Sequence, residues 1–286
     1  MNESELKNNL STEIQAIMSP TFNIAIADTP TVPSLDDSQV TYPNLTTNEQ
    51  RCKRIETCVL YVDIRSSTEL SFAHRKSTLA RLYCAFVRAM AQCASFYGGK
   101  VRNIVGDRMM VAFDAANSEA NAVRTAILMN TVIQYVLNPN FTPAEFRCGI
   151  GIDHGAMLIT KAGIVKQGSE NTEYKSLVWL GRPANVASKL TDEANKPNGI
   201  VRVPRATASQ RTKPILMTKA VLDGYLRWLS QTTLARGEWV GVRKLWQPCA
   251  IKVAGYTGTI YGGDVVLREF QTPRSVPKTY PRPGLR

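Results

Sequence analysis

The feature that most constrains the fold is an apolar run at residues 58–64 (CVLYVDI) that ends in an acid and precedes a helix and a tight hairpin. An apolar run of this length is typical of a buried strand. Apolar residues then recur at three- and four-residue spacing over 79–94, which predicts a helix that Gly98-Gly99 ends. Two further apolar runs flank Gly106-Asp107, which is the signal of a hairpin. A strand, a crossover helix and a hairpin in this order predict a mixed sheet.

The rest of the chain continues this mixture of hairpins and helices. We predict a helix at 118–137, a strand pair at 146–153 and 156–165 around His154-Gly155, a short strand at 176–180, a helix at 184–194, a strand at 200–203, a helix at 218–229, and a last hairpin at 250–267 with turns at Gly258 and Gly262-Gly263. Such an order indicates an α+β fold and not a doubly wound parallel sheet.

Composition along the chain suggests three parts. The predicted parts are an N-terminal arm or linker (1–50), a main domain (51–270) with a helical, basic insertion at about 205–247, and a basic tail (271–286). No run approaches the length of a membrane-spanning helix, and the first ten residues are polar, so we expect a cytoplasmic protein without a signal peptide.

Charge and cysteine usage narrow the possible partners. The 286 residues have a formal net charge of +12, which favours anionic partners such as nucleoside triphosphates or nucleic acid. No aromatic and basic motif of the known nucleic-acid-binding modules is present, so nucleic acid is the weaker expectation. Six cysteines without a Cys-x-x-Cys pair, and only two histidines, argue against zinc and against a disulfide framework.

Two carboxylates are the candidate metal ligands. Asp63 ends the first strand and Asp107 lies in the hairpin turn, so the two side chains meet if strand and hairpin pair. Oxygen ligands of this kind suit Mg²⁺ or Mn²⁺, and two such ions can promote in-line displacement at a phosphate. Taken singly, Asp63 is better explained as a helix N-cap and Asp107 as a turn former, and it is the two in register with a later motif that favour a metal site. The polar residues Ser66, Ser67 and Thr68 open the next helix, where backbone N–H groups can bind phosphate.

Three segments resemble the signatures of the class III adenylate and guanylate cyclases. The segment 59–70 (VLYVDIRSSTEL) is similar to the first signature, a strand followed by Asp-Ile, a small polar residue and Thr. The segment 98–113 (GGKVRNIVGDRMMVAF) resembles the second, and 180–190 (LGRPANVASKL) resembles the third. Their order and spacing match the family over about residues 55–195.

The resemblance implies a class III cyclase-like mixed sheet, related to the ferredoxin-like palm and flanked by helices, in a head-to-tail homodimer. It implies two divalent ions per site, held by Asp63, Asp107 and the Ile64 carbonyl of one chain. It assigns ribose orientation to Asn185 and stabilisation of charge on the α-phosphate to Lys189, both from the other chain.

Several positions depart from the purine cyclases. Asn103 stands four residues before Asp107, where those enzymes usually carry a base-reading Lys or Glu, and Val178 stands where Asp or Cys is common. An Asn amide can both donate to and accept from a pyrimidine edge. The usual Arg is Lys189, which keeps the charge and loses the planar fork. The phosphate-binding Lys of the last hairpin is not evident in the sequence. Lys252 is a candidate for it, and Tyr256 lies nearer the family position.

These departures resemble the Pycsar anti-phage cyclases, which make cyclic UMP or cyclic CMP. The resemblance implies UTP, and less so CTP, as substrate, and an effector that responds to the cyclic product. Three alternatives stay open at this point. They are a purine cyclase with an unusual pocket, a catalytically inactive cyclase-homology module that binds nucleotide or dimerises, and a nucleic-acid-binding protein on a related palm-like sheet.

Overall fold

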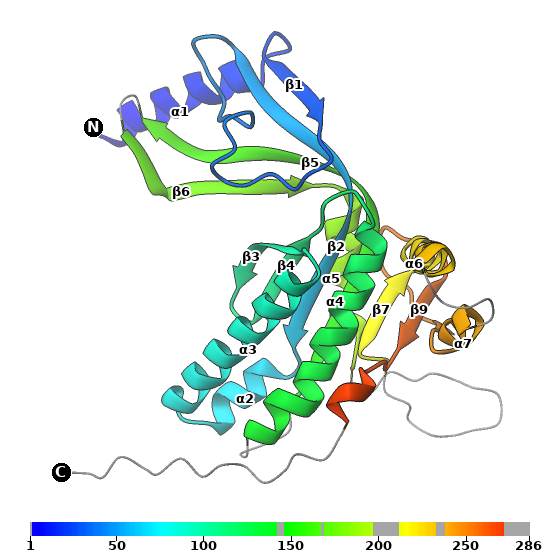
Figure 1. Cartoon of the computed structure of the whole chain (residues 1–286). Helices are drawn as coiled ribbons and strands as arrows, with labels where there is room; N and C mark the ends of the chain where they lie inside the picture. The colour runs from blue at the N-terminus through cyan, green and yellow to red at the C-terminus, as the bar shows by residue number, and fades with distance from the viewer. Residues whose placement is uncertain (1, 142–145, 167–168, 197–211, 233–237, 272–286) are drawn as a thin grey trace.

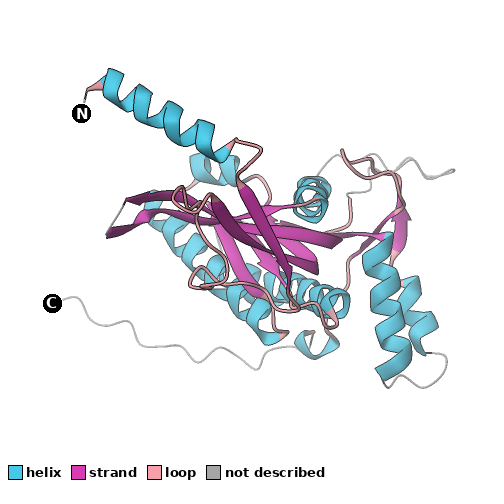
Figure 2. Ribbon diagram, turned by 90° about the horizontal axis from the view of Figure 1, so that it is seen from above, coloured by secondary structure: helices cyan, strands magenta, loops and turns pink. Residues whose placement is uncertain are grey.

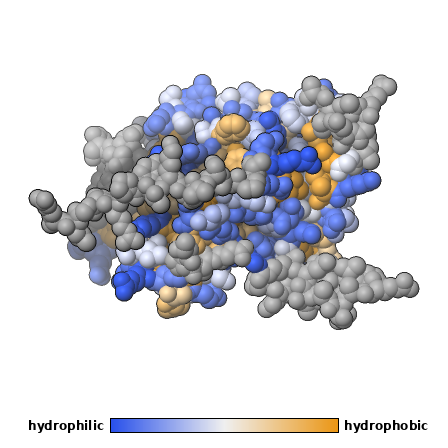
Figure 3. Space-filling view, turned by 60° about the horizontal axis from the view of Figure 1, so that its bottom comes forward, coloured by the Kyte–Doolittle hydropathy of each residue, from blue (hydrophilic) through white to orange (hydrophobic). Residues whose placement is uncertain are grey.

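The computed structural model describes residues 2–141, 146–166, 169–196, 212–232 and 238–271. Figure 1 shows a helix-covered sheet from which a long strand extension projects, with the N-terminal helix beside it. Among the described residues, no helix is both long and apolar enough to cross a membrane. The end of the molecule seen in Figure 3 is mostly hydrophilic, with small separate apolar patches between the polar side chains.

The described elements alternate between helices and strands. In chain order they are α1 (Glu3–Ile17), β1 (Asn23–Asp28), β2 (Glu49–Ile64), α2 (Ser67–Ala73), α3 (Lys76–Phe96), β3 (Lys100–Val105), β4 (Arg108–Ala112), α4 (Ser118–Val132), a π-helical turn (Ile133–Leu137), a 3₁₀ turn (Asn138–Asn140), β5 (Cys148–Lys166), β6 (Ser169–Leu180), α5 (Arg182–Glu193), β7 (Ile215–Thr218), α6 (Lys219–Thr232), α7 (Glu238–Lys244), β8 (Gln247–Cys249), β9 (Ile260–Gly263) and a 3₁₀ turn (Arg268–Phe270).

One mixed sheet contains all these strands. Its main path runs β3-β4-β2-β5-β7-β9-β8, while β1 pairs with β2 and β6 pairs with β5. The β2–β5 ladder is antiparallel and continuous from Lys53 opposite Ile159 to Ile64 opposite Cys148. Parallel pairing occurs between β1 and β2 and between β5 and β7. The predicted α+β class with a mixed sheet is therefore confirmed.

Helices cover both faces of the sheet (Figure 2). On one face, α3, α4 and α6 pack over a core that includes Val62, Ile64 and Met109. On the other face, α5 lies over a smaller core that includes Val59 and Met110. Side chains alternate between the two faces of a strand, so Asp63, which lies between Val62 and Ile64, belongs to the α5 face.

Most predicted elements are present, and two predictions are wrong. The strand pair around His154-Gly155 is the single strand β5, because β2 begins at Glu49 and offers a partner to both halves. Gly155 continues the ladder with a φ of 153°. The last hairpin, predicted at 250–267, is formed by β8 and β9 and begins earlier, at Gln247. Gly262-Gly263 lies inside β9 and not in a turn. The predicted strand at 200–203 lies outside the described residues.

The N-terminal region adds regular structure to the sheet. Residues 1–50 contain α1, whose described residues include none that are buried, and β1, which pairs in parallel with the start of β2. Pairing with β1 and β5 explains why β2 starts nine residues before the apolar run at 58–64 and reaches back to Glu49. The arm predicted for this region therefore includes an edge strand of the main sheet.

The packing of α5 on β5 depends on a residue without a side chain. A Cβ at Gly151 would lie 2.2 Å from the Ala187 carbonyl oxygen and 2.4 Å from the Thr191 nitrogen. We expect Gly151→Ala to lower the free energy of unfolding by about 1–3 kcal/mol, as overpacking does in other cores. Thermal denaturation followed by circular dichroism measures it. Gly241→Ala is the matched control, because nothing lies within 4 Å of the added Cβ. Equal melting of the two variants would contradict this packing.

Candidate active site

The structure brings Asp63 and Asp107 to the same end of the sheet. Asp63 is the penultimate residue of β2, and Asp107 lies in the turn between β3 and β4. The two side chains approach because β4 pairs antiparallel with β2. Gly106 takes a φ of 62° in this turn, a conformation that glycine adopts without steric cost. The predicted juxtaposition of strand and hairpin is present.

The two carboxyl groups interact electrostatically. Burial raises the pKa of Asp107, the negative charge of Asp63 raises that pKa further, and a hydrogen bond from Ser67 acts in the opposite direction. Asp107 Oδ2 is buried and has no hydrogen-bond partner. Two adjacent carboxylates with a buried, unsatisfied oxygen are an unfavourable arrangement by themselves. The residues therefore fit a hard divalent cation, which prefers carboxylate oxygen and would relieve both costs.

Two arginines surround Asp63. Arg108 Nη2 donates a hydrogen bond of 2.7 Å to Asp63 Oδ2, and Arg65 Nη2 lies 3.8 Å from the same oxygen. Sequence reasoning missed Arg108, although it directly follows the Gly-Asp turn. The available signal was its position: Arg108 directly follows Asp107 and begins β4, the strand expected to pair with the strand that carries Asp63.

Helix α5 carries the remaining catalytic candidates and is fixed at both ends. At its start, Arg182 Nη2 lies 3.3 Å from the buried carboxylate of Asp153. At its end, Arg65 donates hydrogen bonds to the main-chain carbonyls of Thr191 and Asp192. Buried apolar residues hold one face of the helix against the sheet.

Asn185 and Lys189 lie one turn apart on the outer face of α5, and both are exposed. Ser188 and Asp192 lie beside them on the same face and contact Arg108. Sequence reasoning also missed this second pair. The four-residue spacing of two polar residues on an exposed helix face was the only sequence signal for them.

The candidate base-reading residues lie on different strands. Asn103 is exposed on β3, opposite Met110 and next to an irregularity in the ladder. Val178 is half-buried on β6, opposite Thr160 of β5. Three strands, β4, β2 and β5, separate β3 from β6 in the sheet. Their joint role in reading a base stays a prediction.

The candidate phosphate-binding segment begins directly after β2. The Ile64 side chain is buried and pairs opposite Cys148, which leaves its carbonyl at the end of the strand. Ser66 takes a left-handed conformation with a φ of 56° at the N-cap position of α2, which begins at Ser67, and its side chain makes no capping hydrogen bond. Thr68 is exposed in the first turn of this helix. Phosphate binding by this segment stays a prediction.

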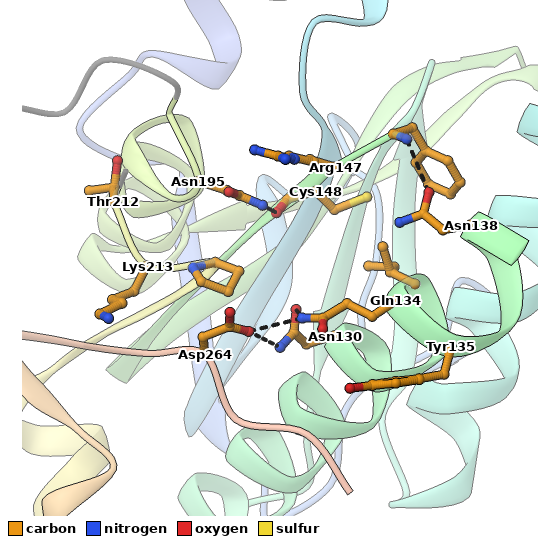
Figure 4. Close-up of a pocket in the computed structure, with 13 residues that line it drawn as sticks. Asn130, Gln134, Tyr135, Asn138, Arg147, Cys148, Asn195, Thr212, Lys213 and Asp264 are labelled. Atoms are coloured by element: carbon orange, nitrogen blue, oxygen red, sulfur yellow. Dashed lines mark hydrogen bonds between the residues drawn. The ribbon is translucent and has the colours of Figure 1, made fainter. Parts of the chain in front are cut away.

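A pocket of about 510 Å³ lies near the start of β5 and β7 and the end of α4 (Figure 4). Its polar wall is organised by Asp264, which accepts hydrogen bonds of 2.9 Å from Asn130 and Gln134. None of the predicted site residues lines it. The Asp63–Asp107 pair lies outside this pocket.

A mixed sheet that joins two carboxylates at one end, beside a helix with exposed amide and ammonium groups, is the arrangement that the sequence predicts for a nucleotidyl cyclase. Comparison with known families agrees with this class. Residues 49–220 match the model described as "Adenylate and Guanylate cyclase catalytic domain", and the chain belongs to this family.

Curated relatives include three enzymes named "Uridylate cyclase". The protein from Burkholderia cepacia is 28% identical over 181 residues, which cover 61% of this chain and 73% of that protein. The protein from Gulbenkiania mobilis is 32% identical over 177 residues, covering 58% and 63%. The protein from Xanthomonas perforans is 28% identical over 162 residues, covering 54% and 64%. The chain thus matches slightly less than two thirds of the length of two of these relatives.

Two solved structures of similar fold are named as cyclases. The adenylyl cyclase CyaB from P. aeruginosa aligns with a TM-score of 0.52 at 20% identity, over 73% of this chain and 94% of that one. The guanylyl cyclase Cya2 aligns with a TM-score of 0.51 at 15% identity, over 76% and 96%. At these identities the likeness shows the fold, and it agrees with the predicted class III cyclase-like sheet.

Proposed function

We propose that this protein converts a pyrimidine nucleoside triphosphate, UTP in preference to CTP, into the 3′,5′-cyclic monophosphate and pyrophosphate. The single observation that carries the reaction is the interacting Asp63–Asp107 pair on a cyclase sheet. The pyrimidine base is supported by the relatives named uridylate cyclase and by Asn103 at the base-reading position.

Asp63 and Asp107, with the Ile64 carbonyl, would hold two Mg²⁺ or Mn²⁺ ions. When bound, such ions lower the pKa of an attacking hydroxyl and stabilise charge on the leaving phosphate oxygen. The buried Oδ2 of Asp107 supports this role, because a carboxylate oxygen without a hydrogen-bond partner is free to accept a cation. The backbone of Ser66, Ser67 and Thr68 would position the phosphate chain beside the carboxylates.

The reaction is an internal displacement. The ribose 3′ oxygen forms a bond to the α-phosphorus, the bond to the bridging oxygen of pyrophosphate breaks, and the hydroxyl proton leaves to solvent. Asn185 would orient the ribose through its amide, and the Lys189 ammonium would stabilise negative charge on the α-phosphate as a point charge.

The active site would be shared between two chains in a head-to-tail homodimer. Asp63 and Asp107 of one chain would face Asn185 and Lys189 of the other. The exposure of Asn185 and Lys189 supports this arrangement, because the amide and the ammonium are available to a neighbouring chain. We also propose that the cyclic product acts as a second messenger in anti-phage defence, through an effector that binds it.

The base preference tests the role of Asn103. We expect Asn103→Lys to reduce turnover of UTP by about tenfold or more relative to the other triphosphates, because an amide that donates and accepts is replaced by a group that only donates. Competition among ATP, GTP, CTP and UTP, with Mn²⁺ and with pyrophosphate release as readout, measures this ranking. Since Asn103 is exposed, the melting temperature serves as a control and should stay near that of the original chain. An unchanged ranking would remove Asn103 from base recognition.

The same assay on the unmodified chain tests the proposed function itself. Preferential consumption of ATP or GTP would replace the pyrimidine assignment with a purine cyclase. Consumption of none of the four triphosphates, with nucleotide binding retained, would indicate a catalytically inactive module, for which the change from Arg to Lys189 is the best sequence argument.

A further inference from the structure

Arg108 joins a candidate metal ligand to helix α5. Its Nη2 donates 2.7 Å to Asp63 Oδ2 and also forms an ion pair with Asp192. Its Nη1 donates 2.9 Å to Ser188 Oγ. The guanidinium thus bridges β2 and α5, and its side chain is 29% exposed. The planar guanidinium has several N–H donors, which suits a position where the three acceptors Asp63, Ser188 and Asp192 lie in different directions.

The contact with Asp63 places a protein cation on an oxygen that the proposed metal site requires. An arginine stays protonated in proteins, so it does not leave this carboxylate by losing its charge. A divalent ion and Arg108 therefore compete for Asp63. The guanidinium and the metal ion would lie only a few ångströms apart on the same carboxylate. At that distance their positive charges repel one another strongly, so both do not bind Asp63 equally well at once.

Arg65 differs from Arg108 in this respect. Arg65 Nη2 is 3.8 Å from Asp63, and its N–H groups are used by the main-chain carbonyls of Thr191 and Asp192. Arg65 therefore acts chiefly as a C-terminal cap of α5. Arg108 alone donates directly to the Asp63 carboxylate among the hydrogen bonds of the described residues.

The structure also contains the acceptors that would keep Arg108 after it releases Asp63. Ser188 and Asp192 are one helical turn apart on the outer face of α5, and both already contact the guanidinium. Asp192 retains a negative charge for it, so the displaced arginine is not left unpaired. The cost of giving up the Asp63 contact is thereby reduced.

We propose that Arg108 is a displaceable counter-ion of the metal site, and that Asp192 and Ser188 hold it when a divalent cation takes Asp63. This inference rests on the proposed metal site of Asp63 and Asp107. Arg108 is a positioning residue in this scheme, since it acts through Asp63 and not on the substrate. The balance between Asp63 and Asp192 for one guanidinium then sets the affinity for the metal.

Mn²⁺ binding to the full chain, without nucleotide, tests the proposal by isothermal titration or by electron paramagnetic resonance of free Mn²⁺. We expect Arg108→Gln to tighten Mn²⁺ binding by about tenfold. An adjacent cation changes the proton affinity of a carboxylate by about tenfold or more, and we take the lower end of that range for the metal ion. Asp192→Asn should weaken binding, because Arg108 then has Asp63 as its remaining carboxylate. Arg54→Gln is the matched control. It removes the same charge from the far end of β2, where Arg54 pairs with Asp28.

The double variant separates this mechanism from a general charge effect. If Asp192 acts through Arg108, Asp192→Asn has little effect on Mn²⁺ affinity once Arg108 is Gln. Equal effects of Asp192→Asn in both backgrounds, or weaker binding by Arg108→Gln, would overturn the proposal. Metal-free melting curves identify a variant that is simply unfolded, and Ser188→Ala then serves as an uncharged substitute for Asp192→Asn, with weaker binding expected.

The outcomes also distinguish this proposal from the proposed function. Opposite shifts in Mn²⁺ affinity without turnover of any triphosphate would support the counter-ion and reject the cyclase. Turnover of UTP with Mn²⁺ affinities that do not respond to Arg108 would retain the cyclase and reject the counter-ion. Absence of Mn²⁺ binding to both the original chain and Arg108→Gln would reject the counter-ion together with the metal site.

Discussion

Asp107→Asn is expected to lower the rate of cyclic nucleotide formation by at least about a hundredfold. In metal sites, replacing a residue that only hydrogen-bonds to a ligand already reduces metal affinity or activity by about 10–100-fold, and Asp107 is proposed as a direct ligand. An amide oxygen carries no formal charge and binds a divalent ion far more weakly than a carboxylate. Release of pyrophosphate under saturating Mn²⁺ measures the loss. Asp63→Ala is expected to act in the same direction.

The same change should stabilise the metal-free fold. The pKa of Asp107 is raised from 3.8, so the folded chain holds this proton more tightly than the unfolded chain does. Stability from this group therefore falls as pH rises from the unfolded value through the raised pKa, and it stays low above that window. At pH 7 Asp107→Asn should therefore raise the metal-free melting temperature, because it removes a carboxylate that burial and the Asp63 charge disfavour.

Asp37→Asn is the control with the opposite sign. Burial acts to raise the pKa of Asp37, but hydrogen bonds from Lys53 and from the Gln39 backbone outweigh it, and the pKa is lowered. This carboxylate contributes stability above pH 3.8 that is lost as pH falls through the lowered pKa. Asp37→Asn should therefore lower the melting temperature at pH 7 and retain turnover.

Full activity of Asp107→Asn would refute the metal site.

Mixing two inactive chains should restore activity. In the proposed homodimer, a heterodimer of Asp63→Ala and Asn185→Ala chains has one site with both defects and one site with neither. Random exchange gives about half heterodimers, each with one of two sites intact, so about a quarter of the original activity is expected. The effect is large because each variant alone is expected to be nearly inactive.

The complementation assay needs proof that subunits exchange. Two affinity tags, one on each chain, identify heterodimers by sequential purification. A mixture of Asp63→Ala with Asp107→Ala is the matched control, because both defects lie in the same half-site and every site in the heterodimer then lacks one carboxylate. Inactive heterodimers of the first mixture would exclude sites shared between two chains.

Local patterns predicted most of the fold. The helices α3, α5 and α6 and the hairpin of β3 and β4 were predictable because their residues alternate or recur with the period of the element. Glycines also lie after α3, before α5 and in the turn of the hairpin. The continuity of β5 was not predictable, because His154-Gly155 has the composition of a turn. The partner strand β2 supplies pairing on both sides of this dipeptide, so tertiary pairing overrides the local signal.

For the site, the sequence by itself determined the candidate residues: Asp63 at the end of an apolar strand, Asp107 after a glycine, and Asn185 and Lys189 one turn apart. Residue type and short-range spacing are local properties that a chain displays without folding. Only the tertiary structure decided that Arg108 donates hydrogen bonds to Asp63 and to Asp192, which is 84 residues further along the chain. Such a contact depends on the register of β4 against β2 and on the docking of α5 across them, because each sets a distance that no local pattern encodes.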